Sequence, residues 1–136
     1  DLEYQLDVEA ATLEKQRVVV DLSDGGVFPD GMIASPDGTR LIVALYNPTD
    51  APGEARQYVI ETGELERVWR VPKSPQVTCP QLVAVDSQWK LFLTTAVEHM
   101  SADRQVQHSA AGSLFLADTG WEVADDTTSR RLVLDY

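Results

Sequence analysis

Two Pro-Asp-Gly triplets, residues 29–31 and 36–38, contain the carboxylates of this sequence that are best suited to chemistry. A carboxylate can ligate a divalent cation or accept a proton from water. Each triplet also suits a β-turn, because Pro fixes φ and Gly tolerates an unusual backbone conformation. Residues 32–36 between them suit a strand that spans ~17 Å. Asp30 and Asp37 should therefore lie at opposite ends of that strand, and only one can face a common site.

The surroundings of the two aspartates separate them. Asp37 precedes Gly38, Thr39 and the next apolar run, which is ordinary hairpin sequence. Asp30 instead follows a long loop, residues 21–28, and enters its strand directly. Asp30 is therefore the stronger candidate for a functional carboxylate.

The elements around these residues are predicted to be β-strands. Short apolar runs, flanked by Gly, Pro, Asp or Thr, predict strands at residues 18–20, 41–46, 57–60, 68–71, 81–85, 91–95, 113–117 and 131–134. Residues 8–15 are weakly amphipathic and residues 98–108 are polar. Neither stretch has clear helix caps, so we expect loops or hairpin turns there. The sequence predicts an all-β fold.

The strand pattern repeats along the chain. Residues 33–43 resemble residues 83–93 at a constant offset of 50, and residues 58–65 resemble both 4–7 and 114–120. A repeat of ~40–50 residues that holds four short strands is typical of a β-propeller blade. An antiparallel sandwich with fortuitously similar hairpins is the alternative.

The repeat divides the chain into two to three blades. Residues 1–24 would form the outer strands of one blade, residues 31–71 a complete blade, and residues 81–134 the last blade. Closed propellers need about 4–8 blades. We therefore expect the missing N-terminal blades as a partner, either a separate or cleaved chain or another copy of this one. The opening residue is Asp1 rather than Met, which fits a mature or cut piece.

Composition excludes several classes of partner. The 22 acidic and 11 basic residues give a net charge of −11, which argues against nucleic acid or an anionic membrane. A single cysteine, Cys79, cannot form an internal disulfide. The acidic N-terminus lacks the basic segment of a signal peptide, and no apolar run approaches the ~20 residues of a membrane span. We expect a soluble, cytoplasmic protein.

Residues 27–32 and 35–38 resemble the F-P-D-G-(hydrophobic)…D-x-x-G signature of the regucalcin (senescence marker protein) and gluconolactonase family. Residues 4–7, 43–47, 77–79, 93–96 and 111–115 resemble further family segments, in family order. Together they span most of the chain. The family fold is a six-bladed propeller of roughly twice this length, so the resemblance implies the C-terminal two to three blades.

The resemblance also implies a site. Asp30 matches the family aspartate that binds a divalent metal and is proposed to serve in catalysis. Calcium is the expected metal, with zinc, magnesium or manganese as alternatives, and the other family ligands lie in earlier blades. Thr78 and Cys79, at the entry of the next inner strand, are candidate substrate-binding residues, although a small buried side chain is the alternative for Cys79.

Other residues are weaker candidates. We expect His99 and His108 to be loop histidines, and Glu98 to point away from His99 on a strand, which gives no metal pair. No nucleophile elbow surrounds Ser101 or Ser109, so a serine hydrolase is not indicated.

The predicted function is part of a divalent-metal-dependent hydrolase that opens a lactone or a similar ester. A non-catalytic propeller that acts as a binding or regulatory scaffold is the alternative. Three departures from the family support that alternative, because they would alter the channel mouth. They are an insertion at residues 48–56, the pair Glu98-His99, and Pro80 where the last inner strand begins. A third hypothesis is an organophosphate-type hydrolase, which related propellers can be.

Overall fold

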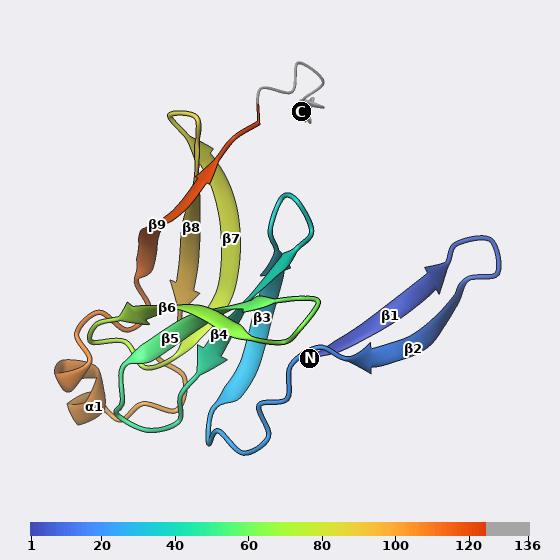
Figure 1. The fold of residues 1–136 in the computed structure, drawn as a ribbon. Helices are drawn as coiled ribbons and strands as arrows, with labels where there is room; N and C mark the ends of the chain where they lie inside the picture. The colour runs from blue at the N-terminus through green and yellow to red at the C-terminus, as the bar shows by residue number, and fades with distance from the viewer. Residues whose placement is uncertain (125–136) are drawn as a thin grey trace, which may run out of the picture.

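The computed structural model describes residues 1–124, and antiparallel strands dominate them (Figure 1). The first sheet pairs β1 (Leu2–Asp7) with β2 (Thr12–Val18). The second sheet contains β3 (Phe28–Ala34), β4 (Arg40–Tyr46), β5 (Gly53–Val59) and β6 (Leu65–Val71). The third contains β7 (Val77–Val85), β8 (Gln88–Thr95) and β9 (Leu114–Glu122). Strands that follow one another in the chain are neighbours in each sheet, as consecutive propeller blades require.

The prediction of a loop at residues 98–108 is wrong, because this stretch contains the short helix α1 (Ala102–Gln107). Ser101 caps it, since its Oγ accepts a hydrogen bond from the backbone N–H of Arg104 at 3.4 Å. The sequence hides this cap because no Glu or Gln stands three residues after Ser101 to complete a capping box. In the described part of the chain no helix is long and apolar enough to cross a membrane.

Two strand predictions also need correction. The inner strand predicted at residues 32–36 is β3, which begins at Phe28 and ends at Ala34. Of the strand predicted at residues 18–20, only Val18 belongs to β2. Val20 lies outside the strand and is buried. The strand predicted at residues 131–134 lies outside the described residues.

The main core lies between the second and third sheets. It contains Ile42, Ala44, Ala55, Trp69, Val71, Val77, Leu91 and Leu93, all buried. The alternate β4 side chains, Val43 and Leu45, face the other way and pack with Val20 and Tyr58. Strand β4 is therefore covered on both faces, which explains its unbroken apolar sequence. Each such large side chain contributes about 1.5–3 kcal/mol by burial.

Polar contacts join the outer strands of these two sheets. Trp69 Nε1 on β6 donates to the Asp118 carbonyl of β9 at 3.1 Å. Arg67, whose guanidinium lies 4.6 Å from the Trp69 ring centroid, donates to the Thr119 carbonyl at 2.6 Å. These contacts attach the outer strand of the second sheet to the outer strand of the third.

The β1–β2 hairpin extends away from the rest of the molecule (Figure 1). Arg17 connects it to the second sheet by donating to the carbonyls of Ile60 at 2.7 Å and Glu61 at 2.9 Å. Exposed apolar side chains gather on the hairpin, namely Leu2, Tyr4, Leu6, Val8, Leu13 and Val18. In the described residues this apolar surface has no covering sheet.

Candidate active site

Asp30 lies in a β-bulge near the start of β3. Pro29 pairs with Leu45 and Met32 pairs with Val43, so Asp30 and Gly31 together face the single residue Ala44. The prediction of a β-turn at this triplet is wrong. An edge strand tolerates a proline that cannot donate, and the bulge absorbs the extra residue. Bulges re-aim side chains, and Asp30 is left exposed to solvent.

Gly31 brings Asp30 next to the other predicted site residues. A Cβ at Gly31 would lie only 2.7 Å from the Thr78 carbonyl oxygen and 2.9 Å from Cys79 Cα. The inner strands β3 and β7 therefore approach each other at this point with no room for a side chain. The three residues singled out from the sequence, Asp30, Thr78 and Cys79, are neighbours on adjacent strands.

Thr78 and Cys79 differ in what their side chains do. The hydroxyls of Thr78 and Thr94 lie 2.7 Å apart, and Thr94 Oγ1 accepts from the Cys79 N–H at 3.1 Å. Thr78 is thus held by the β7–β8 pairing. Cys79 is exposed, so the alternative of a small buried side chain is wrong. Cys79 lies on the inner strand β7, which is hydrogen-bonded only to β8 in the described residues.

Sequence reasoning missed a group of residues at the same end of the sheets. The Glu98 carbonyl accepts from Gln76 Nε2 at 2.8 Å and from the Tyr46 hydroxyl at 3.4 Å. Tyr46 ends β4 and pairs with Phe28 at the start of β3, two residues from Asp30. Burial raises the pKa of Tyr46, and the negative charges of Glu98 and Asp30 add to this effect while Arg104 opposes it. Tyr46 therefore lies near both Asp30 and Glu98.

A polar cluster joins α1 to the β4–β5 loop at this end. Asp50 accepts from His108 Nε2 and from Arg104 Nε, each at 2.9 Å. The hydrogen bond from His108, and then that from Arg104, holds the pKa of Asp50 below its ordinary value. His108 is buried at the end of α1 rather than in a loop, which corrects its sequence interpretation. We call Asp50, Arg104 and His108 the helix–loop clamp.

Glu98 and His99 also differ from expectation. Glu98 follows β8 rather than lying in a strand, and its carboxylate is 3.5 Å from His99 Nε2. Both side chains are mostly exposed, at 62% and 84%. His99 has a φ of 56°, so the backbone turns sharply here and brings the two side chains together.

Asp37 behaves as hairpin sequence predicts. Its Oδ1 accepts from Ser35 Oγ at 2.5 Å, from Thr39 Oγ1 at 2.8 Å and from the Thr39 N–H at 3.0 Å. These hydrogen bonds, led by that from Ser35, lower the pKa of Asp37 to about 2. Figure 1 shows the β3–β4 turn at the opposite end of the sheets from α1. Asp37 therefore stabilises a turn far from Asp30.

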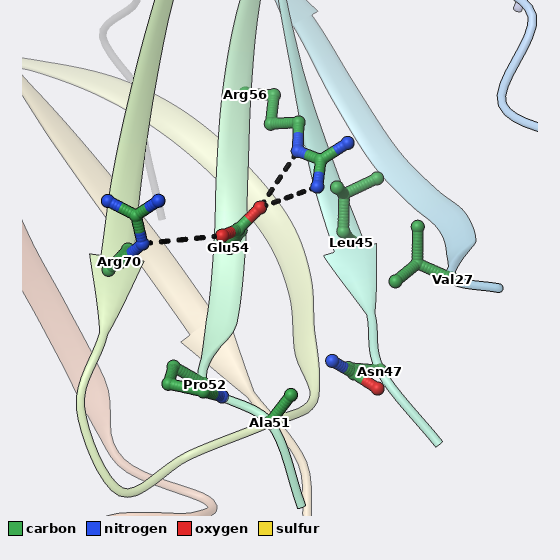
Figure 2. Close-up of a pocket in the computed structure, with 8 residues that line it drawn as sticks. All are labelled: Val27, Leu45, Asn47, Ala51, Pro52, Glu54, Arg56 and Arg70. Carbon is green, nitrogen blue, oxygen red and sulfur yellow. Dashed lines mark hydrogen bonds and ion pairs between the residues drawn. The ribbon is translucent and has the colours of Figure 1, made fainter. Parts of the chain in front are cut away.

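A pocket of about 220 Å³ lies on one face of the second sheet, and Leu45 is among the residues that line it (Figure 2). Glu54 crosses it and pairs with Arg56 at 2.7 Å and with Arg70 at 3.5 Å. Arg56 is therefore committed to an ion pair within the sheet, and Asp30 does not line the pocket. We interpret this polar pocket as part of the surface of a blade and not as a reaction site.

The residues around Asp30 fit a metal only in part. Its exposed carboxylate is a suitable oxygen ligand for a hard divalent cation. Among residues 1–124, however, no group of three or more His, Cys, Asp or Glu side chains could hold a metal ion. Calcium takes about 6–8 oxygen ligands. The described residues thus offer one ligand and not a complete set.

Comparison with known proteins agrees with this architecture. Residues 2–97 match a family model described as the SMP-30/Gluconolactonase/LRE-like region. The chain belongs to this family. No curated protein matches the sequence. Membership confirms the family resemblance of the sequence motifs around Asp30.

A solved structure shows the fold. The chain is similar to a luciferin-regenerating enzyme, with a TM-score of 0.66 and 21% identity. The similarity covers 89% of this chain but 38% of that one, so the chain spans well under half of that structure. At this identity the likeness concerns the fold alone. It confirms the prediction of an all-β chain that forms two to three blades of a β-propeller.

Proposed function

We propose that this chain is part of a divalent-metal-dependent hydrolase that opens a lactone or a similar ester, and that Asp30 is its metal ligand. The observation that carries the proposal is the bulge, which leaves Asp30 exposed while the next residue, Gly31, packs closely against β7. Membership of a family whose description includes gluconolactonase supports the substrate class.

The residues of this chain have separate proposed roles. A bound divalent ion would polarise the ester carbonyl. Asp30 would hold that ion and accept a proton from water at its free carboxylate oxygen. Thr78 and Cys79, on the facing strand, would contact the substrate. Calcium suits a carboxylate in an otherwise oxygen-rich setting, and zinc, magnesium or manganese are alternatives.

The proposed site needs more chain than residues 1–124 supply. We propose that further blades of the propeller, on another polypeptide or another copy of this chain, pair with the β1–β2 hairpin. Its exposed apolar surface, which includes Leu6, Leu13 and Val18, supports this idea, because a sheet with such a face normally packs on another. Native mass spectrometry of the folded particle tests it through the assembly mass and the bound metal.

The two aspartates provide the test of the site. In the assembled particle, Asp30→Asn should lower lactone hydrolysis by at least ~100-fold, since a positioned base or ligand contributes that much. It should also abolish calcium binding measured by isothermal titration calorimetry. Asp37→Asn is the matched control and should retain both properties. Full hydrolysis by the Asp30 variant would sink the site assignment.

A non-catalytic scaffold remains a second candidate, favoured by the incomplete ligand set around Asp30. A particle that binds neither calcium nor zinc, magnesium or manganese, and hydrolyses neither lactones nor phosphotriesters, would support it. Hydrolysis of phosphotriesters without lactones would instead favour an organophosphate-type hydrolase.

A further inference from the structure

The end of the sheets that holds Asp30 also holds a second exposed carboxylate, that of Glu98. Tyr46 connects the two, because it lies in register with the start of β3 and its hydroxyl donates to the Glu98 carbonyl at 3.4 Å. Glu98 belongs to the connection between β8 and β9, whereas Asp30 belongs to β3 of the neighbouring sheet. Asp30 and Glu98 therefore lie at the same end of the two neighbouring sheets.

The backbone at Glu98 is fixed rather than free. Besides Tyr46, the Gln76 side chain donates to its carbonyl at 2.8 Å, and Gln76 is only 1% exposed. The backbone of that glutamine is held as well, since its carbonyl accepts from the Ala96 N–H at 3.0 Å. The next residue, His99, has a φ of 56°, a conformation that a non-glycine residue adopts only when its surroundings impose it.

The helix–loop clamp holds the other side of the same segment. Arg104 and His108 on α1 bind Asp50 of the β4–β5 loop, so α1 is attached to the neighbouring sheet. Arg104 also donates to the Thr49 carbonyl at 3.2 Å. The backbone of the segment that contains Glu98 is thus anchored on both sides of this residue.

The charge of Glu98 is poorly compensated. Its one ion-pair partner in the described residues is His99, at 3.5 Å, with both side chains mostly exposed. An exposed pair of this kind contributes little. The nearby cation Arg104 is bound to Asp50 instead. A negatively charged ligand at this end of the sheets would therefore be repelled by Glu98 as well as by Asp30.

We propose that Glu98 is a specificity-determining residue that excludes substrates with a negative charge near the ester and admits neutral or cationic ones. The proposal rests on the proposed function, because it takes Asp30 as the centre of the site. The selected class is then a lactone or ester without carboxylate or phosphate substituents.

The test measures binding as well as turnover. Two lactams of the same ring size, one neutral and one with a carboxylate substituent, serve as probes that the protein cannot hydrolyse as esters. Their dissociation constants are measured by titration calorimetry on the assembled particle. We expect wild type to prefer the neutral lactam by about tenfold, as a like charge at short range in a largely aqueous setting implies.

Charge variants of Glu98 then test whether this residue causes the preference for the neutral lactam. Glu98→Gln should reduce it about five- to tenfold, and Glu98→Lys should reverse it. Glu64→Gln is the matched control, because Glu64 is an exposed carboxylate in the β5–β6 turn. That turn lies beside the β3–β4 turn, since the Ile60 N–H donates to the Thr39 carbonyl. This control should bind like wild type. An unchanged ratio in Glu98→Gln, or failure of wild type to bind either lactam, overturns the proposal.

Parallel hydrolysis of the corresponding lactones separates the two proposals. If the lactams show the expected preference and its loss in Glu98→Gln, but no lactone is hydrolysed, the hydrolase proposal fails and the charge selectivity stands. If lactones are hydrolysed equally well with and without the carboxylate, in wild type and variant alike, the hydrolase stands and the role of Glu98 fails.

Discussion

The two Pro-Asp-Gly triplets share a sequence and lie at opposite ends of one strand. Residues 29–31 are inside β3 at a bulge, whereas residues 36–38 form the turn that follows it. Asp37 accepts three hydrogen bonds from Ser35 and Thr39. Asp30 receives none from the described residues. The same tripeptide therefore gives a carboxylate used by the turn at one end and an available carboxylate at the other.

The difference comes from the neighbours and not from the triplets. Ser35 and Thr39 flank the second aspartate with hydroxyl donors, and such side chains close turns on their own backbone. The first triplet is flanked by Phe28 and Met32, which offer no donor. A carboxylate without local partners next to a close strand–strand contact can bind something else, and this is the basis of the site proposal.

The largest expected effect comes from the two glycines of these triplets. Gly31→Ala should destabilise the protein by ~3 kcal/mol, because its Cβ would meet β7 backbone at 2.7 Å and backbone cannot rotate away. Gly38→Ala should cost only about 1 kcal/mol, since its φ of 72° is unfavourable for alanine but nothing lies within 4 Å of a Cβ there. Urea denaturation of both variants measures the difference.

Equal losses in the two variants would contradict the close approach of β3 and β7. A loss confined to Gly31→Ala, with faster hydrogen exchange in β7 but not in the β3–β4 turn, would sharpen the comparison. It would show that the Asp30 end depends on contact between sheets, whereas the Asp37 end depends on local backbone geometry.

An intermediate effect is expected at the helix–loop clamp. His108→Ala removes a buried donor to Asp50, so α1 should detach from the β4–β5 loop more often. Amide exchange in residues 98–112 should accelerate about tenfold, since local opening sets exchange in such segments. His99→Ala is the matched control, because His99 is exposed and should leave exchange in α1 unchanged. Equal protection in both variants would show that the clamp does not hold α1.

Sequence reasoning located most of the strands after residue 28, and Asp30, but neither the β1–β2 pairing nor what surrounds Asp30. Periodicity and repetition report which residues share an inner strand, so Asp30, Thr78 and Cys79 could be selected before the structure. The contacts of Tyr46 and Gln76 with Glu98, and of Asp50 with His108, join residues 22 to 58 positions apart. No local pattern encodes such pairs. The weak cap at Ser101 concealed α1 for the same reason, because its docking onto Asp50 stabilises it more than its own sequence does.

The smallest expected effect is the pH dependence of the Asp37 turn. Its pKa is about 2 when folded, against an ordinary value of 3.8. A lowered pKa stabilises the folded state above the ordinary value, and this stabilisation disappears as the pH falls through the folded value. Asp37→Asn should therefore be slightly less stable than wild type near neutral pH. The difference should shrink as the pH falls from about 4 and disappear below about pH 2.

Denaturation of wild type and Asp37→Asn at a series of pH values measures this convergence. Ser35→Ala keeps the Asp37 charge but removes the donor that lowers the Asp37 pKa most. The stability of this variant should therefore change with pH over a narrower range than that of wild type. A stability difference that persists unchanged to about pH 2 would mean that Asn lacks a shape or hydrogen bond and not a charge. The second triplet would then stabilise its turn by geometry alone, and the electrostatic contrast with Asp30 would lose its basis.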